Sequence, residues 1–363
     1  MDFRTPVDIP QPPFKIQPCE PLLFVGSCFA DNIGQRFREE GFPVTVNPYG
    51  TMYNPASVLH TIERLSQRDL PLSPATAVPS ASAAVPVSPS TTPAVSPAGS
   101  LAVPVPPSTT PAVSPAGSLA VPVPPATTPA ASPAGSPALP ASLVFLTLGT
   151  NHIYRLKETG AIVDNCEKRP QSLFTEEILS VDECAAYLSQ TVDILRQWNP
   201  DVRIVLTVSP IRYRKYGYHE SQLSKATLLL AIDRLQRPTA SAAVPVPPSA
   251  AVPAASAAVP SSPVPPPYYF PAYEIMMDEL RDYRFYAPDM LHPSQQAVEY
   301  LWERLVDTLF SDAAKTFLDE WRPLKQLLAH KPFNADSEEY RTLMDKTMLK
   351  VEELRKKYSN FAL

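Results

Sequence analysis

The sequence predicts an α/β domain with a mainly parallel five-stranded sheet and helices on both faces. Short apolar runs alternate along the chain with segments whose apolar residues recur at helical spacing, which is the pattern of strands joined by crossover helices. Polar turns follow four of the predicted strands. Because a ligand binds beyond the carboxyl ends of such strands, we expect these turns to converge on one functional edge of the sheet.

The first predicted strand is LLFV at residues 22–25, an apolar run that stops at Gly26 and Ser27. Helical spacing follows over residues 30–40, and the VTV run at 44–46 is the second predicted strand. A strand, a tight turn and a helix in this order raise the Ser27 hydroxyl onto the rim of the sheet, where a nucleophile is useful.

The middle of the chain repeats the alternation. A helix is predicted at residues 55–65, a strand at the apolar run 143–148 and a long helix at 181–198. The run RIVLTV at 203–208 is the fourth predicted strand, and helical spacing resumes at 220–235. Each of the third and fourth predicted strands is therefore followed by a predicted helix.

The last part of the chain supplies the fifth strand. It is predicted at 268–270, and helices are predicted at 272–280 and 294–310. Residues 315–358 are charged and helix-prone, which predicts a C-terminal helical hairpin. We expect the apolar stripe of this hairpin to dock on its own domain, with homodimerisation through these helices as the alternative.

Two tracts are too rich in proline for helix or sheet. The chain of 363 residues has 46 prolines, most of them in residues 71–142 and 238–267, which are nearly all Pro, Ala, Ser, Thr and Val. Within the first tract, STTPAVSPAGSLAVPVPP at 90–107 is followed at once by a second copy. Frequent proline removes backbone donors, so we predict that both tracts are disordered or loosely polyproline-like.

The tracts define the domain organisation. Without them about 260 residues remain, a size that suits one α/β domain with a terminal appendage. The predicted domain consists of residues 1–70, 143–237 and 268–310, and the helical hairpin occupies 311–363.

Composition argues against several classes of partner. A formal charge of -5 and a pI near 5.6 give no basic face, which argues against nucleic acid or an anionic membrane surface and favours a small or polar substrate. The chain has no recognisable signal segment and no apolar run long enough to span a bilayer, so we expect a cytoplasmic location. The four cysteines lack C-x-x-C spacing, so we predict free thiols and no metal site. We also expect no cofactor.

Three side chains suggest nucleophilic catalysis. Ser27 follows the first strand, and the segment DMLHPS places Asp289 three residues before His292. At that spacing the carboxylate orients the imidazole while the other ring nitrogen faces a hydroxyl. The alternatives are a capping serine, a capping aspartate and a solvated histidine. Cys28 is an alternative nucleophile, although burial under the helix is the favoured interpretation of that thiol.

Seven segments of the sequence resemble one known family. They are FRTPVDIP at 3–10, GSCFA at 26–30, VNPYGTMYNP at 46–55, LTLGT at 146–150, TVSPIR at 207–212, QLSKATLLLAID at 222–233 and YYFPAYEIMMDELRDYRFYAPDMLHPS at 268–294. In order and spacing they are similar to the GSCFA-domain family, within the SGNH or GDSL-like hydrolase superfamily. The resemblance implies a flavodoxin-like three-layer α/β/α sandwich and the hydrolysis or transfer of esters through a serine nucleophile.

The resemblance also implies roles for single residues. Ser27 matches the nucleophile, and His292 with Asp289 matches the Asp-x-x-His of the last block. The implied oxyanion hole consists of the Ser27 amide, the Gly50 amide and the Asn151 side chain. From the residues alone, Gly50 is as readily a turn glycine with positive φ, and Asn151 as readily binds its own loop.

Two loop residues are predicted as possible substrate-binding residues: Arg212, which could hold an anionic group, and His219, which could line the pocket. The predicted function is an esterase that cleaves a carbohydrate or small-molecule O-acyl ester, acetyl in particular. An acyltransferase is an alternative because transfer uses the same residues. The third possibility is a non-catalytic binding protein or a degenerate family member, in which the proline tracts serve as spacers.

Overall fold

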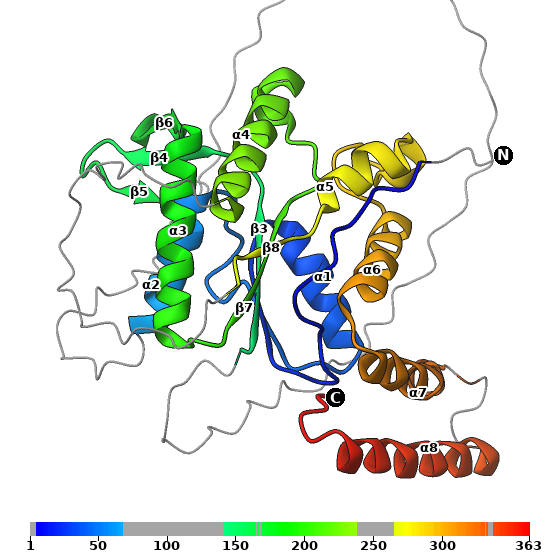
Figure 1. Cartoon of the computed structure of the whole chain (residues 1–363). Helices are drawn as coiled ribbons and strands as arrows, with labels where there is room; N and C mark the ends of the chain where they lie inside the picture. The colour runs from blue at the N-terminus through cyan, green and yellow to red at the C-terminus, as the bar shows by residue number, and fades with distance from the viewer. Residues whose placement is uncertain are drawn as a thin grey trace, which may run out of the picture. The chain divides into compact units, whose positions relative to one another are not determined.

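Five parallel strands form the central sheet in the computed structural model of the chain (Figure 1). They are β1 (Leu22–Gly26), β2 (Val44–Val46), β3 (Leu143–Leu148), β7 (Arg203–Val208) and β8 (Tyr268–Tyr269). All five agree with the prediction from sequence, and they lie in the order β2-β1-β3-β7-β8. Counted along the chain, this is the 2-1-3-4-5 order of flavodoxin-like folds, which confirms the predicted fold class.

The structure describes residues 5–67, 141–164, 166, 169–237, 265–330, 332 and 337–363. Almost all of the two proline-rich tracts lies outside these residues, so the disorder predicted for them stays a prediction. Within the described ranges, no helix combines the length and the apolar character that a membrane crossing requires.

Two helices cover one face of the sheet, α1 (Cys28–Glu39) and α6 (Gln295–Leu309) (Figure 1). Aromatic rings fill this side of the core. Phe24 of β1 stacks on Phe145 of β3 with ring centroids 4.5 Å apart. Phe37 of α1 meets Trp302 of α6 edge to face at 4.8 Å. Burial of these large rings holds α1 against β1 and so fixes the turn between them.

Three helices cover the opposite face, α2 (Pro55–Gln67), α3 (Val181–Trp198) and α4 (Tyr218–Gln236) (Figure 1). This side of the core is mainly aliphatic. Ile62, Leu188 and Leu228 come from the three helices and share one buried cluster with Leu146 of β3. The helical layers on the two faces make the three-layer sandwich that the sequence predicts.

The segment predicted as a helix at 272–280 is α-helical only in its first turn, α5 (Ala272–Glu274). Residues Ile275–Leu280 (η3) form a π-helix, whose last turn closes with a hydrogen bond from Arg281 N to Met276 O at 3.2 Å. The residue that follows the π-helix, Arg281, has a left-handed backbone conformation with φ 41° and ends the helix. Such widened turns occur frequently at functional sites, and this one borders a cavity described below.

A small antiparallel sheet after β3 is absent from the prediction. Its strands are β4 (His152–Leu156), β5 (Ile162–Val163) and β6 (Phe174–Ile178), in the order β5-β4-β6. The short 3₁₀ helices are η1 (Gln171–Leu173), η2 (Arg214–Tyr216) and η4 (Tyr283–Phe285). The strands of this sheet lack the apolar runs that reveal the central sheet, because only three of their twelve residues, His152, Ile153 and Phe174, are buried.

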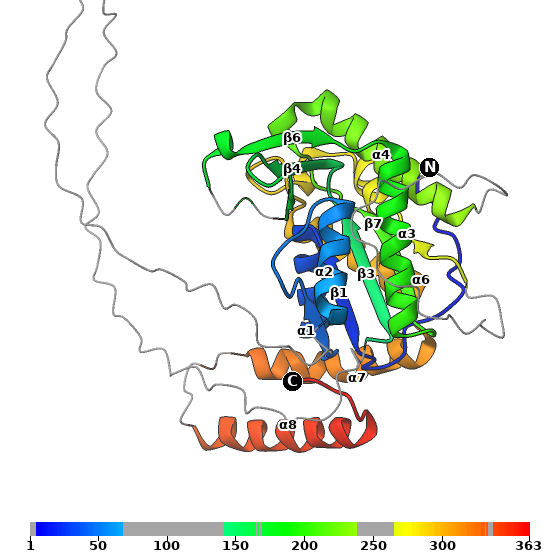
Figure 2. The ribbon, with the colours of Figure 1, turned by 90° about the vertical axis from the view of Figure 1, so that its left-hand side faces the viewer.

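The predicted C-terminal hairpin consists of α7 (Asp312–Ala329) and α8 (Glu338–Lys357), which lie side by side (Figure 2). Its apolar side packs on the domain. Phe317 of α7 meets Phe42 with ring centroids 5.7 Å apart, and Trp321 Nε1 donates to Glu39 O at 3.1 Å. The hairpin thus docks on its own domain, as expected, and homodimerisation through it stays a prediction.

Both proline-rich tracts rejoin the described chain at the amino-terminal edge of the sheet. Ser142, directly before β3, donates from its amide to the carbonyl oxygen of Pro21, directly before β1, at 3.1 Å. Pro265, shortly before β8, accepts from Arg196 Nη2 in the last turn of α3 at 2.7 Å. These junctions therefore lie where strands begin, whereas the polar turns follow the ends of the strands.

Candidate active site

The turn between β1 and α1 places Ser27 at the carboxyl edge of the sheet. Gly26 ends β1 with φ +146°, and a Cβ atom on this residue would lie 2.1 Å from Thr147 O of β3, so the close approach of the two strands requires glycine. Ser27 is the N-cap of α1, and its Oγ accepts from Phe29 N at 3.3 Å. The helix therefore begins directly behind the serine, with the positive end of its dipole at this edge.

Asp289 and His292 form a hydrogen-bonded pair within one turn. His292 Nδ1 lies 2.6 Å from Asp289 Oδ2. The other carboxylate oxygen accepts from the amides of Leu291 and His292, at 2.9 and 3.0 Å. These hydrogen bonds, that of Leu291 first, lower the pKa of Asp289 to about 2. An ionised carboxylate keeps the imidazole proton on Nδ1 and leaves Nε2 as an acceptor.

Ser27 and His292 line the same cavity, although they come from opposite ends of the chain. Its volume is about 320 Å³, and its lining includes Ser27, Cys28, Gly149, Ser209, Lys225 and His292. The turn that carries the histidine is attached to the end of β7, because Arg212 N donates to Leu291 O at 3.0 Å. The fold thus brings the predicted nucleophile and the predicted base to one cavity.

Two of the predicted oxyanion donors are bonded elsewhere. Ser27 N donates to Thr147 O and to Thr147 Oγ1, both at 3.0 Å. Gly50 N donates to Asn47 O at 2.8 Å, in a turn where Gly50 has φ +90°. Gly50 does not border the Ser27 cavity and has the backbone conformation that the turn alternative expects.

The third predicted donor, Asn151, does not border the Ser27 cavity either. Its Nδ2 donates to Leu179 O at 2.7 Å, and its backbone amide donates to Ser224 Oγ at 3.0 Å. The chain turns here into β4, which directs this side chain toward the residue after β6. The structure therefore does not bring Asn151 to Ser27.

Lys225 of α4 is a cavity residue that the sequence analysis does not identify. Its side chain is 2% exposed, and Nζ donates to Gly149 O at 2.7 Å and to Ser209 O at 2.8 Å, beyond the ends of β3 and β7. An ammonium group has three hydrogens, so one is left for another acceptor. One sequence signal could have indicated that Lys225 is buried. It lies on the same face of the predicted helix as the apolar residues Leu228 and Ile232.

Burial also sets the protonation of two groups at the cavity. It lowers the pKa of the Lys225 ammonium to about 7, and a charge on Cys28 acts in the opposite direction. Burial raises the pKa of the Cys28 thiol. Because the thiolate is the reactive form, this shift argues against Cys28 as the nucleophile and leaves the hydroxyl of Ser27.

The pKa of Lys225 predicts that stability rises with pH above about 7. The folded protein releases the lysine proton near pH 7, whereas the unfolded chain keeps it up to about 10.5, so the unfolded state binds more protons between these values. Relative to Lys225→Met, the free energy of unfolding of the wild type should gain about 1.4 kcal/mol per pH unit in this window. Urea unfolding at three pH values measures the difference, with the half-exposed Lys215 changed to methionine as the control. Equal pH slopes for wild type and Lys225→Met would contradict the prediction.

Of the two predicted substrate-binding residues, only Arg212 borders the Ser27 cavity. His219 is exposed in the first turn of α4 and does not line this cavity. In the described ranges, no group of three or more His, Cys, Asp or Glu side chains is arranged to hold a metal ion.

Comparisons with known proteins give two family matches and one structural match. The profile of the GSCFA family matches residues 21–75 and 134–305, and that of the GSCFA domain protein C-terminal domain matches residues 321–363. A crystal structure of an acetyl esterase mutant with acetate ion is 10% identical with a TM-score of 0.24, over 52% of this chain and 61% of that chain. No curated protein matches the sequence.

Proposed function

The chain belongs to the GSCFA family, whose profile matches more than half of it, and we propose that it is a serine hydrolase of ester bonds related to the SGNH and GDSL-like enzymes. The observation that carries the proposal is the shared cavity of Ser27 and His292, with a carboxylate oxygen of Asp289 2.6 Å from the imidazole. The proposed substrates are small-molecule or carbohydrate O-acyl esters, acetyl esters in particular.

In the proposed reaction, His292 Nε2 takes the Ser27 proton as Ser27 Oγ attacks the carbonyl carbon of the ester. The tetrahedral intermediate then collapses, the ester C–O bond breaks, and His292 returns the proton to the leaving alkoxide. Water, deprotonated by the same imidazole, attacks the acyl-serine carbonyl; the bond from the carbonyl carbon to Ser27 Oγ then breaks, His292 returns the proton to Ser27 Oγ, and the acid leaves. Asp289 stays ionised throughout, since its pKa is about 2, and it stabilises the imidazolium that forms.

Two groups at the cavity are proposed to stabilise the oxyanion. Cys28 opens α1, so its amide has no acceptor inside the helix, and a helix N-terminus favours negative charge. Lys225 supplies the ammonium hydrogen that its two carbonyl partners leave. In a site that excludes bulk water, such donors act more strongly than they do in solution. This pair takes the role that the resemblance assigns to Gly50 and Asn151.

A fluorophosphonate probe tests the proposed nucleophile, because it labels serines that are activated by a neighbouring base. The folded wild type is expected to be labelled at Ser27, and Ser27→Ala is expected to lose the label. Cys28→Ala should keep it, because the thiol takes no part in the attack. Mass spectrometry of the labelled peptide identifies the residue.

One control separates lost chemistry from lost stability. Ser27→Ala also removes an N-cap hydrogen bond, which costs about 1 kcal/mol. Ser337 caps α8 in a similar way, with its Oγ accepting from Tyr340 N at 3.2 Å, so Ser337→Ala carries a similar cost away from the cavity and should still be labelled. A folded wild-type protein that resists the probe would support the non-catalytic alternative.

A further inference from the structure

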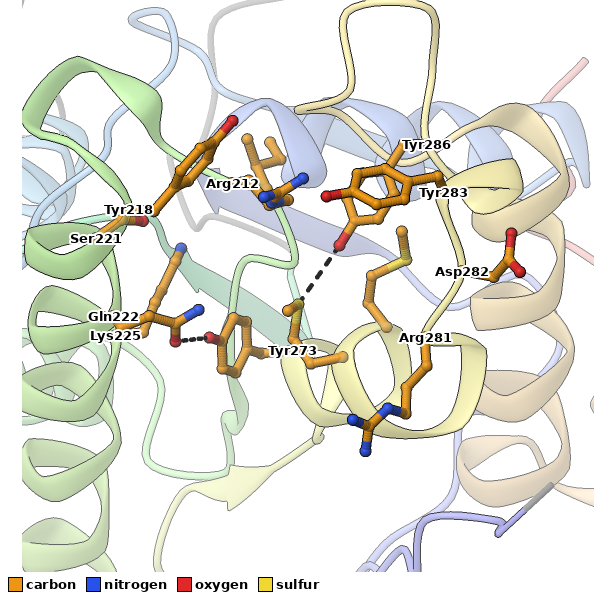
Figure 3. A pocket seen from close by; sticks show the side chains of 13 residues that line it. Arg212, Tyr218, Ser221, Gln222, Lys225, Tyr273, Arg281, Asp282, Tyr283 and Tyr286 are labelled. Atoms are coloured by element: carbon orange, nitrogen blue, oxygen red, sulfur yellow. Dashed lines mark hydrogen bonds between the residues drawn. The ribbon is translucent and has the colours of Figure 1, made fainter.

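A second cavity adjoins the one that holds Ser27. Its volume is about 270 Å³, and Ile211, Arg212 and Lys225 line both cavities, so these side chains stand in the wall between them. Four tyrosines border the second cavity, namely Tyr218, Tyr273, Tyr283 and Tyr286 (Figure 3). We call it the tyrosine cavity.

Arg212 is held among the tyrosine rings. Its guanidinium carbon lies 4.4 Å from the ring centroid of Tyr218, 5.4 Å from that of Tyr286 and 5.6 Å from that of Tyr283. Figure 3 shows Tyr218 on one side of the arginine and the other two rings on the opposite side. Contact with aromatic faces restricts a flexible side chain, so the guanidinium is already positioned for a ligand.

Two of these rings are unusually exposed for large side chains. Tyr218 is 46% exposed and Tyr283 is 64% exposed, and they come from different elements on two sides of the cavity. Exposed rings that face a cavity offer apolar surface to the C–H face of a ligand ring.

Hydrogen-bonding groups also border the tyrosine cavity. Gln222 accepts from the Tyr273 hydroxyl through Oε1, which leaves the amide hydrogens of Gln222 for a ligand hydroxyl.

The wall between the cavities carries positive charge. In the described residues, the side-chain hydrogen bonds of Arg212 and Lys225 all go to backbone carbonyl oxygens, that of Arg212 to Met290 O at 3.3 Å. The one acid in the lining of the tyrosine cavity, Asp282, is paired with Arg284 at 3.0 Å. In a protein of net charge -5, this local excess of positive charge favours an anionic ligand.

We propose that the tyrosine cavity binds the alcohol part of the ester substrate, as a sugar ring that carries a carboxylate. The carboxylate lies on Arg212, whose planar fork matches its two oxygens, and the sugar ring packs against the exposed ring of Tyr283. This inference rests on the proposed hydrolase, because the neighbouring cavity then receives the acyl group at Ser27. A volume of about 270 Å³ is just below the range of about 300–1,000 Å³ for pockets of drug-sized ligands, and it suits a single ring.

Binding of sugars to the Ser27→Ala variant, which lacks the proposed nucleophile, tests the proposed ligand without turnover. Calorimetry is expected to show that methyl glucuronide binds at least tenfold more tightly than methyl glucoside, because only the former makes a charge-assisted pair. Arg212→Gln should lower the affinity for the glucuronide about tenfold or more, whereas Arg355→Gln, which changes an exposed arginine of α8 that is paired with Glu352 and lies outside the lining, should leave it unchanged. Tyr283→Ala should weaken binding, and Tyr283→Phe should restore it because the ring is kept.

Kinetics of the otherwise wild-type enzyme separate this subsite from the catalytic groups. Tyr283→Ala is expected to lower kcat/KM at least fivefold more for a sugar ester than for p-nitrophenyl acetate, since the latter ester has no sugar. For an O-acetylated methyl glucuronide, the same variant should raise KM at least fivefold with kcat nearly constant.

The outcomes distinguish the two proposals. Equal affinity for glucoside and glucuronide, or tighter binding of glucose 6-phosphate, would overturn the carboxylate assignment. If none of these sugars binds to a protein whose Ser27 reacts with the fluorophosphonate, the tyrosine cavity is not a sugar site and the hydrolase proposal stands. If glucuronide binds but no serine reacts in the wild type, the hydrolase proposal fails and the cavity serves a binding protein.

Discussion

Asp289→Asn is expected to lower kcat for hydrolysis of p-nitrophenyl acetate by about 10³–10⁴-fold, with KM and the fold nearly unchanged. The asparagine Oδ1 can accept from the amides of Leu291 and His292, which donate to Asp289 at 2.9 and 3.0 Å, so the turn is kept. Its Nδ2 then faces His292 Nδ1 and donates to it, which moves the ring proton to Nε2. A protonated Nε2 has no lone pair to accept the hydrogen of Ser27.

A neighbouring aspartate provides the control for this variant. Asp282 also accepts from a backbone amide, that of Arg284 at 2.8 Å, but it orients no histidine. Asp282→Asn should therefore keep the kcat of the wild type. Steady-state kinetics and thermal unfolding of both variants make the comparison. Wild-type kcat in Asp289→Asn would show that this carboxylate does not orient the base, and the Ser-His-Asp assignment would fall.

Lys225→Met is expected to lower kcat by about 10²–10³-fold, the usual effect of removing one oxyanion donor. Methionine has an unbranched side chain of similar volume, so it fills the same buried space without the ammonium group. The pH profile should change as well. The pKa of Lys225 is about 7, so wild-type kcat should decline as the ammonium loses its charge above that pH. The variant should lack this alkaline decline.

Lys215→Met is the matched control for Lys225→Met. Lys215 borders the same cavity, but its side chain is 41% exposed and lies 4.0 Å from Glu176. Its removal should change kcat by less than about threefold, as expected for an exposed ion pair of small energy. If Lys225→Met loses stability while both kcat and its pH profile stay as in the wild type, Lys225 is structural and another donor binds the oxyanion.

The central sheet was predictable because parallel strands buried on both faces are continuous apolar runs, as at 143–148 and 203–208. β6 gave no such signal. Its residues Thr175, Glu176 and Ile178 are exposed, so neither an apolar run nor a clear alternation marks it as a strand. The π-helix after α5 was not predictable either, because a local backbone conformation and not a residue pattern sets its wider turn.

In the candidate site, Ser27 and His292 were predictable because each stands in a short motif at the end of a predicted element. Lys225 was not, since its role depends on contacts with Gly149 and Ser209, which belong to other elements and meet it only in the folded chain. The resemblance assigned Gly50 to the oxyanion hole from its position in the sequence. The direction of the Gly50 amide depends on the local turn, however, and there the amide donates to Asn47 O.

The two junctions of the proline-rich tracts have an evolutionary consequence. Each rejoins the chain where a strand begins, so a duplication such as that of residues 90–107 enters the protein there and leaves the pairing of β1 with β3 as it was. Copies of the repeat can therefore be gained or lost during evolution without displacing Ser27 or His292. The opposite edge offers no such freedom, because one added residue there would displace Ser27 or His292 from the cavity that both line.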